Sequence, residues 1–111
     1  MRRVVITGIG IVSSIGVNAE EVTASLRSGK SGISFAPDYA DHGFRSQIHG
    51  RPDIEVSDYI DKRQLRFMGE GAAYNFIAMQ DAIKDSGLTE QEISNERTGL
   101  IMGSGGPSTK N

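Results

Sequence analysis

Residues 2–16 read RRVVITGIGIVSSIG, two arginines followed by a β-branched run and then by glycines at three positions. The run from Arg3 to Gly8 shows no alternation of apolar and polar residues, which is typical of a strand covered on both faces. We therefore expect a strand inside a sheet at Arg3–Gly8. Gly8, Gly10 and Gly16 then allow the chain to turn.

A helix is expected directly after these glycines. Asn18 is followed three residues later by Glu21, which is the spacing of a capping box, and Gly29 is a natural helix end. The apolar residues Val22 and Leu26 are one turn apart, so we expect both to face inward.

The most regular helical pattern runs from about Asp61 to Ser86, where apolar residues recur at spacings of three and four. Gly87 is a natural end for that helix. Gly69 and Gly71 interrupt the pattern, which predicts either close packing against a neighbour or a break into two helices.

The remaining segments complete an α/β pattern. Residues 29–57 are rich in Gly, Ser, Pro and Asp, which indicates a long irregular connection with room for one short strand. Thr89 and Glu92 have capping-box spacing before a short helix, and the stretch TGLIMGS at 98–104 is expected to return as a buried strand. The order β-α-loop-α-β predicts the α/β class. Because two buried strands cannot form a covered sheet alone, this pattern indicates part of a larger sheet.

Composition narrows the class of protein. The chain has 111 residues, 37% of them hydrophobic, and a formal net charge of −2, which gives no global attraction to nucleic acid or to anionic membranes. It contains no cysteine, which excludes disulfides, thiolate metal sites and a cysteine nucleophile within this stretch. No apolar run reaches the roughly 18 residues of a membrane span, so we expect a cytosolic protein.

Three motifs suggest cofactor or metal sites only superficially. Gly8 and Gly10 give G-x-G after a strand, but Ser13 replaces the third glycine and no acidic residue ends a second strand, so a nicotinamide cofactor is not expected. In Gly103–Lys110 the lysine does not directly follow the second glycine, as a phosphate loop requires. His42 and His49 lie in the irregular connection without a surrounding ligand set, which favours a surface or packing role. We expect no cofactor and no metal.

One charged cluster allows two interpretations. Lys62, Arg63 and Arg66 gather near a helix start, where cations are mildly unfavourable because of the helix dipole. The common interpretation is a solvated helix surface. The alternative is a docking spot for an acidic partner, with Arg45 as a further member.

Five stretches occur in the order and spacing of one family along the whole chain: RRVVITGIGIVSSIG, SLRSGKSGI (Ser25–Ile33), IDKRQLRFM (Ile60–Met68), AIKDSGL (Ala82–Leu88) and TGLIMGSGG (Thr98–Gly106). In these stretches the chain resembles the N-terminal part of the β-ketoacyl-acyl-carrier-protein synthases, and among them the bacterial type I group. The GSGG sequence favours type I over type II, although Pro107 is less usual at its position.

The resemblance implies a fold and an activity. The fold would be thiolase-like, with α-β-α-β-α layers, and residues 1–111 would be the N-terminal part of the synthase N-terminal domain, with no complete second domain. The activity would be the decarboxylative Claisen condensation of malonyl-acyl-carrier-protein with an acyl-enzyme thioester in fatty acid biosynthesis. The resemblance also implies a homodimer in the full-length form, and we expect a cytoplasmic protein without nucleic acid or membrane partners. The family's catalytic cysteine and two histidines match no residue of this segment, and His42 and His49 are not their equivalents.

The resemblance also assigns roles to individual residues. Gly106, with Gly105 beside it, would line the acyl channel. The basic residues Lys62, Arg63, Arg66 and Arg45 would meet the acidic helix of acyl carrier protein. The alternative is a non-catalytic homologue that binds acyl carrier protein, or a chain-initiation partner of the polyketide type.

Overall fold

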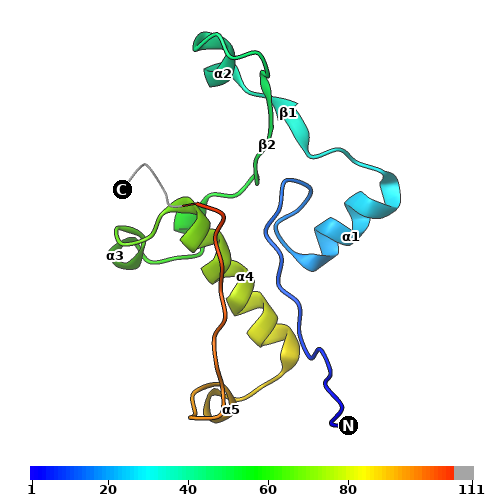
Figure 1. The fold of residues 1–111 in the computed structure, drawn as a ribbon, viewed down its shortest axis with the longest axis vertical. Coiled ribbons are helices and arrows are strands. Elements are labelled where there is room, and N and C mark those ends of the chain that lie inside the picture. Colours follow the sequence, from blue (N-terminus) through cyan, green and yellow to red (C-terminus); the bar gives the residue numbers. More distant parts are fainter. Residues whose placement is uncertain (107–111) are drawn as a thin grey trace. The chain divides into compact units, whose positions relative to one another are not determined.

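The computed structural model describes residues 1–106. Two compact units are present, one made of Met1–Gly10 with Glu55–Asn111 and the other of Ile11–Ile54. The elements in chain order are α1 (Ala19–Ser28), β1 (Ile33–Phe35), α2 (Pro37–Asp41), β2 (Ile48–Gly50), the 3₁₀ helix η1 (Val56–Asp58), α3 (Lys62–Leu65), α4 (Glu70–Ser86) and α5 (Glu90–Ile93) (Figure 1).

Helix α1 begins and ends where the sequence predicts. The Asn18 side chain accepts a hydrogen bond from the Glu21 backbone N–H at 2.9 Å, and Gly29 ends the helix in the left-handed conformation. Val22 is buried as expected, but Leu26 is 68% exposed, so that prediction is wrong. Ser25 is buried instead, because its hydroxyl donates to the Ile15 carbonyl at 2.6 Å and joins α1 to the preceding turn.

The connection after α1 is more regular than expected. Strands β1 and β2 pair antiparallel with Ser34 opposite His49, and α2 lies between them along the chain (Figure 1). Pro37 starts α2 at a position where its missing N–H costs nothing. Ala36 is almost fully buried, and its N–H donates to the Gln47 carbonyl at 2.8 Å. This hydrogen bond continues the pairing of the two strands.

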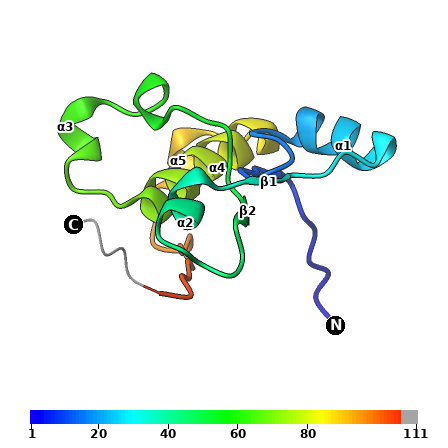
Figure 2. The same ribbon diagram turned by 90° about the horizontal axis from the view of Figure 1, so that it is seen from above.

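The long helix predicted from Asp61 to Ser86 is broken at Gly69. Helix α3 is one short turn, Gly69 is the N-cap of α4, and Gly87 ends α4 with φ of 69°. Figure 2 shows α3 beyond the N-terminal end of α4. A Cβ on Gly71 would meet no atom of residues 1–106 within 4 Å, so close packing within this part of the chain does not explain that glycine. Of the two alternatives, the break into two helices is confirmed.

Neither predicted buried strand forms. Arg3–Gly8 and residues 98–104 have no strand pairing, with Val4 93% and Ile101 96% exposed. A strand satisfies its backbone only through neighbouring strands, and a single added strand is not enough for a stable sheet. The described residues supply no such neighbours to these two segments. The predicted β-α-loop-α-β order is therefore wrong for residues 1–106, whereas the mixture of helices and strands is as expected.

Gly8 and Gly10 allow the N-terminal segment to touch α4. A Cβ on Gly10 would overlap the Ala78 carbonyl, and one on Gly8 would overlap the Ala82 carbonyl. The backbone N–H between them, from Ile9, donates to the Asp85 carboxylate at 2.9 Å. The two glycines therefore serve helix packing, which explains the G-x-G spacing without a dinucleotide.

Candidate functional site

The segment from Glu55 to Arg66 holds the predicted cation cluster. Glu55 opens η1 by accepting from the Ser57 hydroxyl at 2.8 Å and from the Ser57 N–H at 3.3 Å. These two hydrogen bonds, the hydroxyl first, lower the pKa of Glu55 below its ordinary value. Ile60 is buried and fixes the segment to its unit. Asp61 then caps α3 by accepting from the Arg63 N–H at 2.7 Å.

The structure brings Lys62, Arg63 and Arg66 together on one short turn, and we call these three residues the α3 cations. Lys62 and Arg63 lie in α3, Arg66 is its C-cap, and all three are exposed. Within residues 1–106, no hydrogen bond or ion pair engages their charged groups. Their charges are therefore available to a partner. Asp61 is committed to the backbone of α3 and neutralises none of them directly.

An exposed aromatic ring adjoins the α3 cations. The Arg66 guanidinium carbon lies 4.7 Å from the centroid of the Phe67 ring, a cation–π distance. Phe67 is 76% exposed. Sequence spacing did not indicate this pair, because residues i and i+1 of a continuous helix do not face each other.

Arg45 belongs to the other unit, in the exposed connection between α2 and β2. Its membership of the cluster therefore stays a prediction. Near it in the chain, the Tyr39 ring contacts two other rings. Its centroid lies 5.5 Å from that of Phe44 and, edge-on, 5.7 Å from that of His49. The ring centroids of His42 and Phe44 are 6.0 Å apart. These ring contacts, with His42 exposed, agree with the surface or packing role expected for the two histidines. Among residues 1–106, no group of metal ligands is found.

The glycine loop has a local turn, but residues 1–106 build no wall around it. The Ser104 hydroxyl donates to the Gly106 carbonyl at 2.7 Å. A Cβ built on Gly105 or Gly106 meets no atom of residues 1–106 within 4 Å. Pro107 and Lys110, which belong to the same motif, lie outside the described residues. The acyl-channel role of Gly105 and Gly106 is thus untested and stays a prediction.

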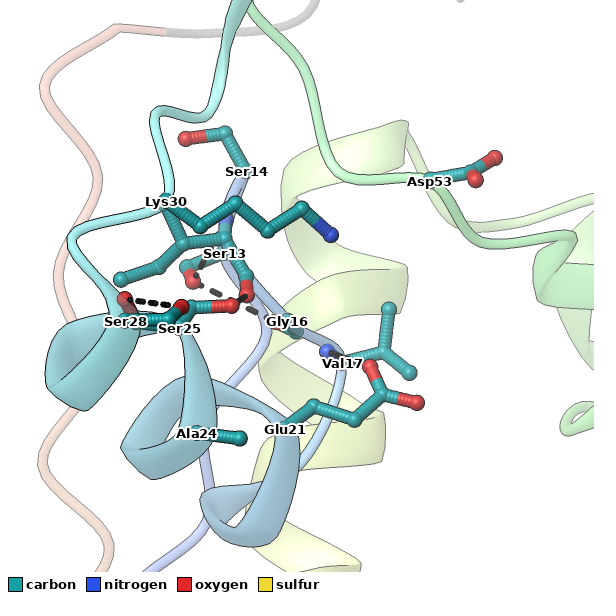
Figure 3. Close-up of a pocket in the computed structure, with 11 residues that line it drawn as sticks. Ser13, Ser14, Gly16, Val17, Glu21, Ala24, Ser25, Ser28, Lys30 and Asp53 are labelled. Atoms are coloured by element: carbon teal, nitrogen blue, oxygen red, sulfur yellow. Dashed lines mark hydrogen bonds between the residues drawn. The ribbon is translucent and has the colours of Figure 1, made fainter.

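Sequence reasoning missed a cavity of about 600 Å³ inside the unit Ile11–Ile54 (Figure 3). Its wall is made by the turn before α1, by α1 itself and by two charged residues further along, Lys30 and Asp53. Figure 3 shows the Lys30 side chain extending across it. The Ser25 and Ser28 hydroxyls donate to the carbonyls of Ile15 and Ser25.

The chemistry of this cavity is limited by those hydrogen bonds. The Ser13 hydroxyl also donates to a carbonyl, that of Gly16, at 3.2 Å. A serine nucleophile needs a base to accept its proton, and the Ser13, Ser25 and Ser28 hydroxyls donate to backbone carbonyls instead. These three hydroxyl groups therefore stabilise the turn and α1 and do not form a nucleophile and base pair. The only sequence signal for this cavity is the pair of adjacent serines, Ser13 and Ser14.

None of the helices among residues 1–106 is both long and apolar enough to cross a membrane.

Of the predicted site clusters, the α3 cations are the only one that residues 1–106 gather on a single helical turn.

Comparison with known proteins agrees with the resemblance found in the sequence. All 111 residues match the family model described as "Beta-ketoacyl synthase, N-terminal domain". The chain is 51% identical to 3-oxoacyl-[acyl-carrier-protein] synthase 1 of Haemophilus influenzae, over 100% of this chain and 27% of that protein. It is 48% identical to the protein of the same name from Escherichia coli, over 99% of this chain and 27% of that protein.

A solved structure matches as well. It is titled "The ishigamide ketosynthase/chain length factor", with a TM-score of 0.69 and 38% identity, covering 79% of this chain and 22% of that one. The α/β, thiolase-like fold class is therefore confirmed. The chain spans about a quarter of the length of the two named relatives. From its first residue to its last, this chain belongs to the β-ketoacyl synthase family, in whose N-terminal domain it lies.

Proposed function

We propose that this chain is part of a condensing enzyme of fatty acid biosynthesis. The reaction would be the decarboxylative Claisen condensation of malonyl-acyl-carrier-protein with an acyl group held as an enzyme thioester. The observation that carries the proposal is the family match over the whole chain, together with two relatives named 3-oxoacyl-[acyl-carrier-protein] synthase 1. Those names do not favour the alternative of a non-catalytic homologue.

Within that enzyme, residues 1–111 would bind and position rather than break bonds. A condensing enzyme needs an acyl-accepting nucleophile, and the segment has no cysteine. Residues 1–111 would be the N-terminal part of the N-terminal domain. We further propose that the complete enzyme is a cytoplasmic homodimer, with neither nucleic acid nor membrane among its partners, for which the weak net charge of −2 is support.

The α3 cations would receive the acidic helix of acyl carrier protein. Three exposed positive charges on one turn, unpaired within residues 1–106, provide a local patch on a chain that is otherwise slightly acidic. Complementary patches raise association rates and suppress wrong partners, even where each exposed ion pair contributes only about 0.2–1 kcal/mol. Arg45 would add a further contact.

The test is charge reversal in a complete synthase that carries this segment. Arg63→Glu with Arg66→Glu should raise the Michaelis constant for carrier-bound substrate about tenfold, because attraction is replaced by repulsion. Turnover of small pantetheine or coenzyme A thioesters, which do not reach α3, should stay near normal. Arg27→Glu with Lys84→Glu is the matched control, since both residues are exposed and the net charge changes equally. Equal losses on carrier-bound and small substrates would end the docking assignment.

Gly105 and Gly106 would line the acyl channel, where the absence of a side chain leaves room for substrate. Gly106→Phe in the complete synthase should shorten the longest acyl chain accepted, because each excluded CH₂ loses about 0.8 kcal/mol of burial. Short primers should be little affected. Gly103→Ala, a small change in the same loop, serves as the control. Unchanged chain-length selectivity would remove Gly106 from the channel.

A further inference from the structure

The end of α3 joins a cation and an aromatic ring in one exposed pair. The Arg66 guanidinium carbon lies 4.7 Å from the centroid of the Phe67 ring, inside the roughly 6 Å range of cation–π attraction. The two side chains meet because α3 stops at Leu65 and the chain turns. In that turn the Phe67 N–H donates to the Gln64 carbonyl at 3.0 Å, and the Met68 N–H donates to the Leu65 carbonyl at 2.9 Å.

The Phe67 ring does not serve the core of its unit. Ile60 is 3% exposed and supplies the buried anchor of the segment, and Leu65 and Met68 are half-buried. Phe67, by contrast, is 76% exposed. Its one recorded ring contact among residues 1–106 is the guanidinium of Arg66.

The pairing holds the arginine without neutralising it. A carboxylate partner would cancel the charge of Arg66, whereas an aromatic face attracts the cation and leaves the charge in place. The ring contact occupies no hydrogen-bond acceptor, so the guanidinium N–H donors can still bind a carboxylate through two parallel hydrogen bonds. Arg66 is therefore held in a form that an acidic partner can use.

We propose that Phe67 is a positioning residue for docking of the acidic carrier protein, acting through Arg66. This inference rests on the proposed function of the α3 cations. A free arginine side chain loses rotamer freedom when it binds, and holding it beforehand reduces that cost. The aromatic ring thus raises affinity for carboxylates on the partner without touching the reacting atoms.

The test uses four variants of a complete synthase, namely Phe67→Leu, Phe67→Tyr, Arg66→Ala and the double variant of Phe67→Leu with Arg66→Ala. Phe67→Leu removes the aromatic face but keeps an apolar side chain, and should raise the Michaelis constant for carrier-bound substrate about two- to fivefold. Phe67→Tyr keeps the face and should restore the wild-type value. Small thioesters should be turned over equally by wild type, Phe67→Leu and Phe67→Tyr. In an Arg66→Ala background, Phe67→Leu should have no further effect, because the residue that the ring positions is gone.

The possible failures are distinguishable. If Phe67→Leu leaves the carrier Michaelis constant unchanged while Arg63→Glu with Arg66→Glu raises it, the positioning role is wrong and docking stands. If the charge reversal itself has no carrier-specific effect, the proposed docking function is wrong as well. If Phe67→Leu lowers the thermal midpoint and impairs both kinds of substrate equally, Phe67 is a core residue and the inference is overturned.

Discussion

Helix α4 and the apolar stretches Val4–Ile6 and Leu100–Met102 belong to the same unit but differ in regularity. Helix α4 is 17 residues long, with Ala73 and Ile77 buried. The two stretches have no regular structure, although they are more apolar than most of the helix. A helix closes its backbone hydrogen bonds within itself, whereas a strand needs a neighbour. An apolar sequence alone therefore does not produce a strand, because a strand forms only where a neighbouring strand can accept and donate its hydrogen bonds.

The largest expected effect concerns those missing neighbours. In the 111-residue chain, the amides of Val5 and Ile101 should exchange with deuterium near the rate of an unstructured peptide, while Ile77 exchanges more slowly. In a complete synthase, sheet pairing should protect Val5 and Ile101 on the order of a thousandfold, which corresponds to about 4 kcal/mol. Exchange mass spectrometry of both proteins gives the comparison. Equal protection in the two would mean that the stretches do not depend on further strands.

The contact between the N-terminal segment and α4 gives the next effect. Gly10→Ala would place a Cβ against the Ala78 carbonyl and should lower the unfolding free energy by about 1–3 kcal/mol, as for other overpacked sites. Gly71→Ala, inside α4, is the matched control, because its Cβ meets no atom of residues 1–106 within 4 Å. It should stabilise by up to about 1 kcal/mol. Denaturant midpoints of a complete synthase report both. Tolerance of Gly10→Ala would show that the segment moves freely over α4.

Helix α5 is short and depends on its cap. The Thr89 hydroxyl accepts from the Glu92 N–H, and the Glu92 carboxylate accepts from the Thr89 N–H at 2.8 Å. Thr89→Ala should cost about 1 kcal/mol of unfolding free energy. Thr23→Ala, in the middle of α1, makes the same chemical change away from a cap and should be nearly neutral. If the two variants unfold alike, the capping box contributes nothing measurable.

The smallest effect is a pH dependence at the same cap. The backbone hydrogen bond from Thr89, followed by that from its hydroxyl, lowers the pKa of Glu92 below its ordinary value of 4.5. The stability that this carboxylate contributes is complete above the unfolded pKa and is lost as pH falls through the lower folded pKa. Wild type should exceed Glu92→Gln in stability near neutral pH, and the gap should close on acidification. A gap that widens in acid would contradict this.

Locally determined features could be predicted from the sequence. Asn18 and Gly29 delimit α1, and Thr89 with Glu92 starts α5, because caps depend on a few adjacent residues. The break at Gly69 was one of two alternatives, and only the structure decides between them. The hairpin strands β1 and β2 have three residues each, too short for periodicity to identify.

Features that depend on tertiary contact could not be predicted. The overlap of Gly10 with α4 requires knowing which helix the segment crosses. The α3 cations were found from their spacing, but the Arg66–Phe67 pair depends on where α3 ends. Helical spacing alone predicts that Leu26 faces inward, but Leu26 is exposed and Ser25 is buried, with its hydroxyl bonded to the Ile15 carbonyl.

The proposed docking of an acidic carrier protein on the α3 cations is electrostatic. Its most direct test is the salt dependence of kcat/KM for a complete wild-type synthase, measured with carrier-bound substrate and with a small pantetheine thioester. Electrostatic docking predicts that the carrier-bound value falls steeply as ionic strength rises, since screening shortens the Debye length to about 8 Å at 0.15 M. The small-thioester value should stay nearly flat. Parallel curves for the two substrates would show that the α3 cations do not dock the carrier protein.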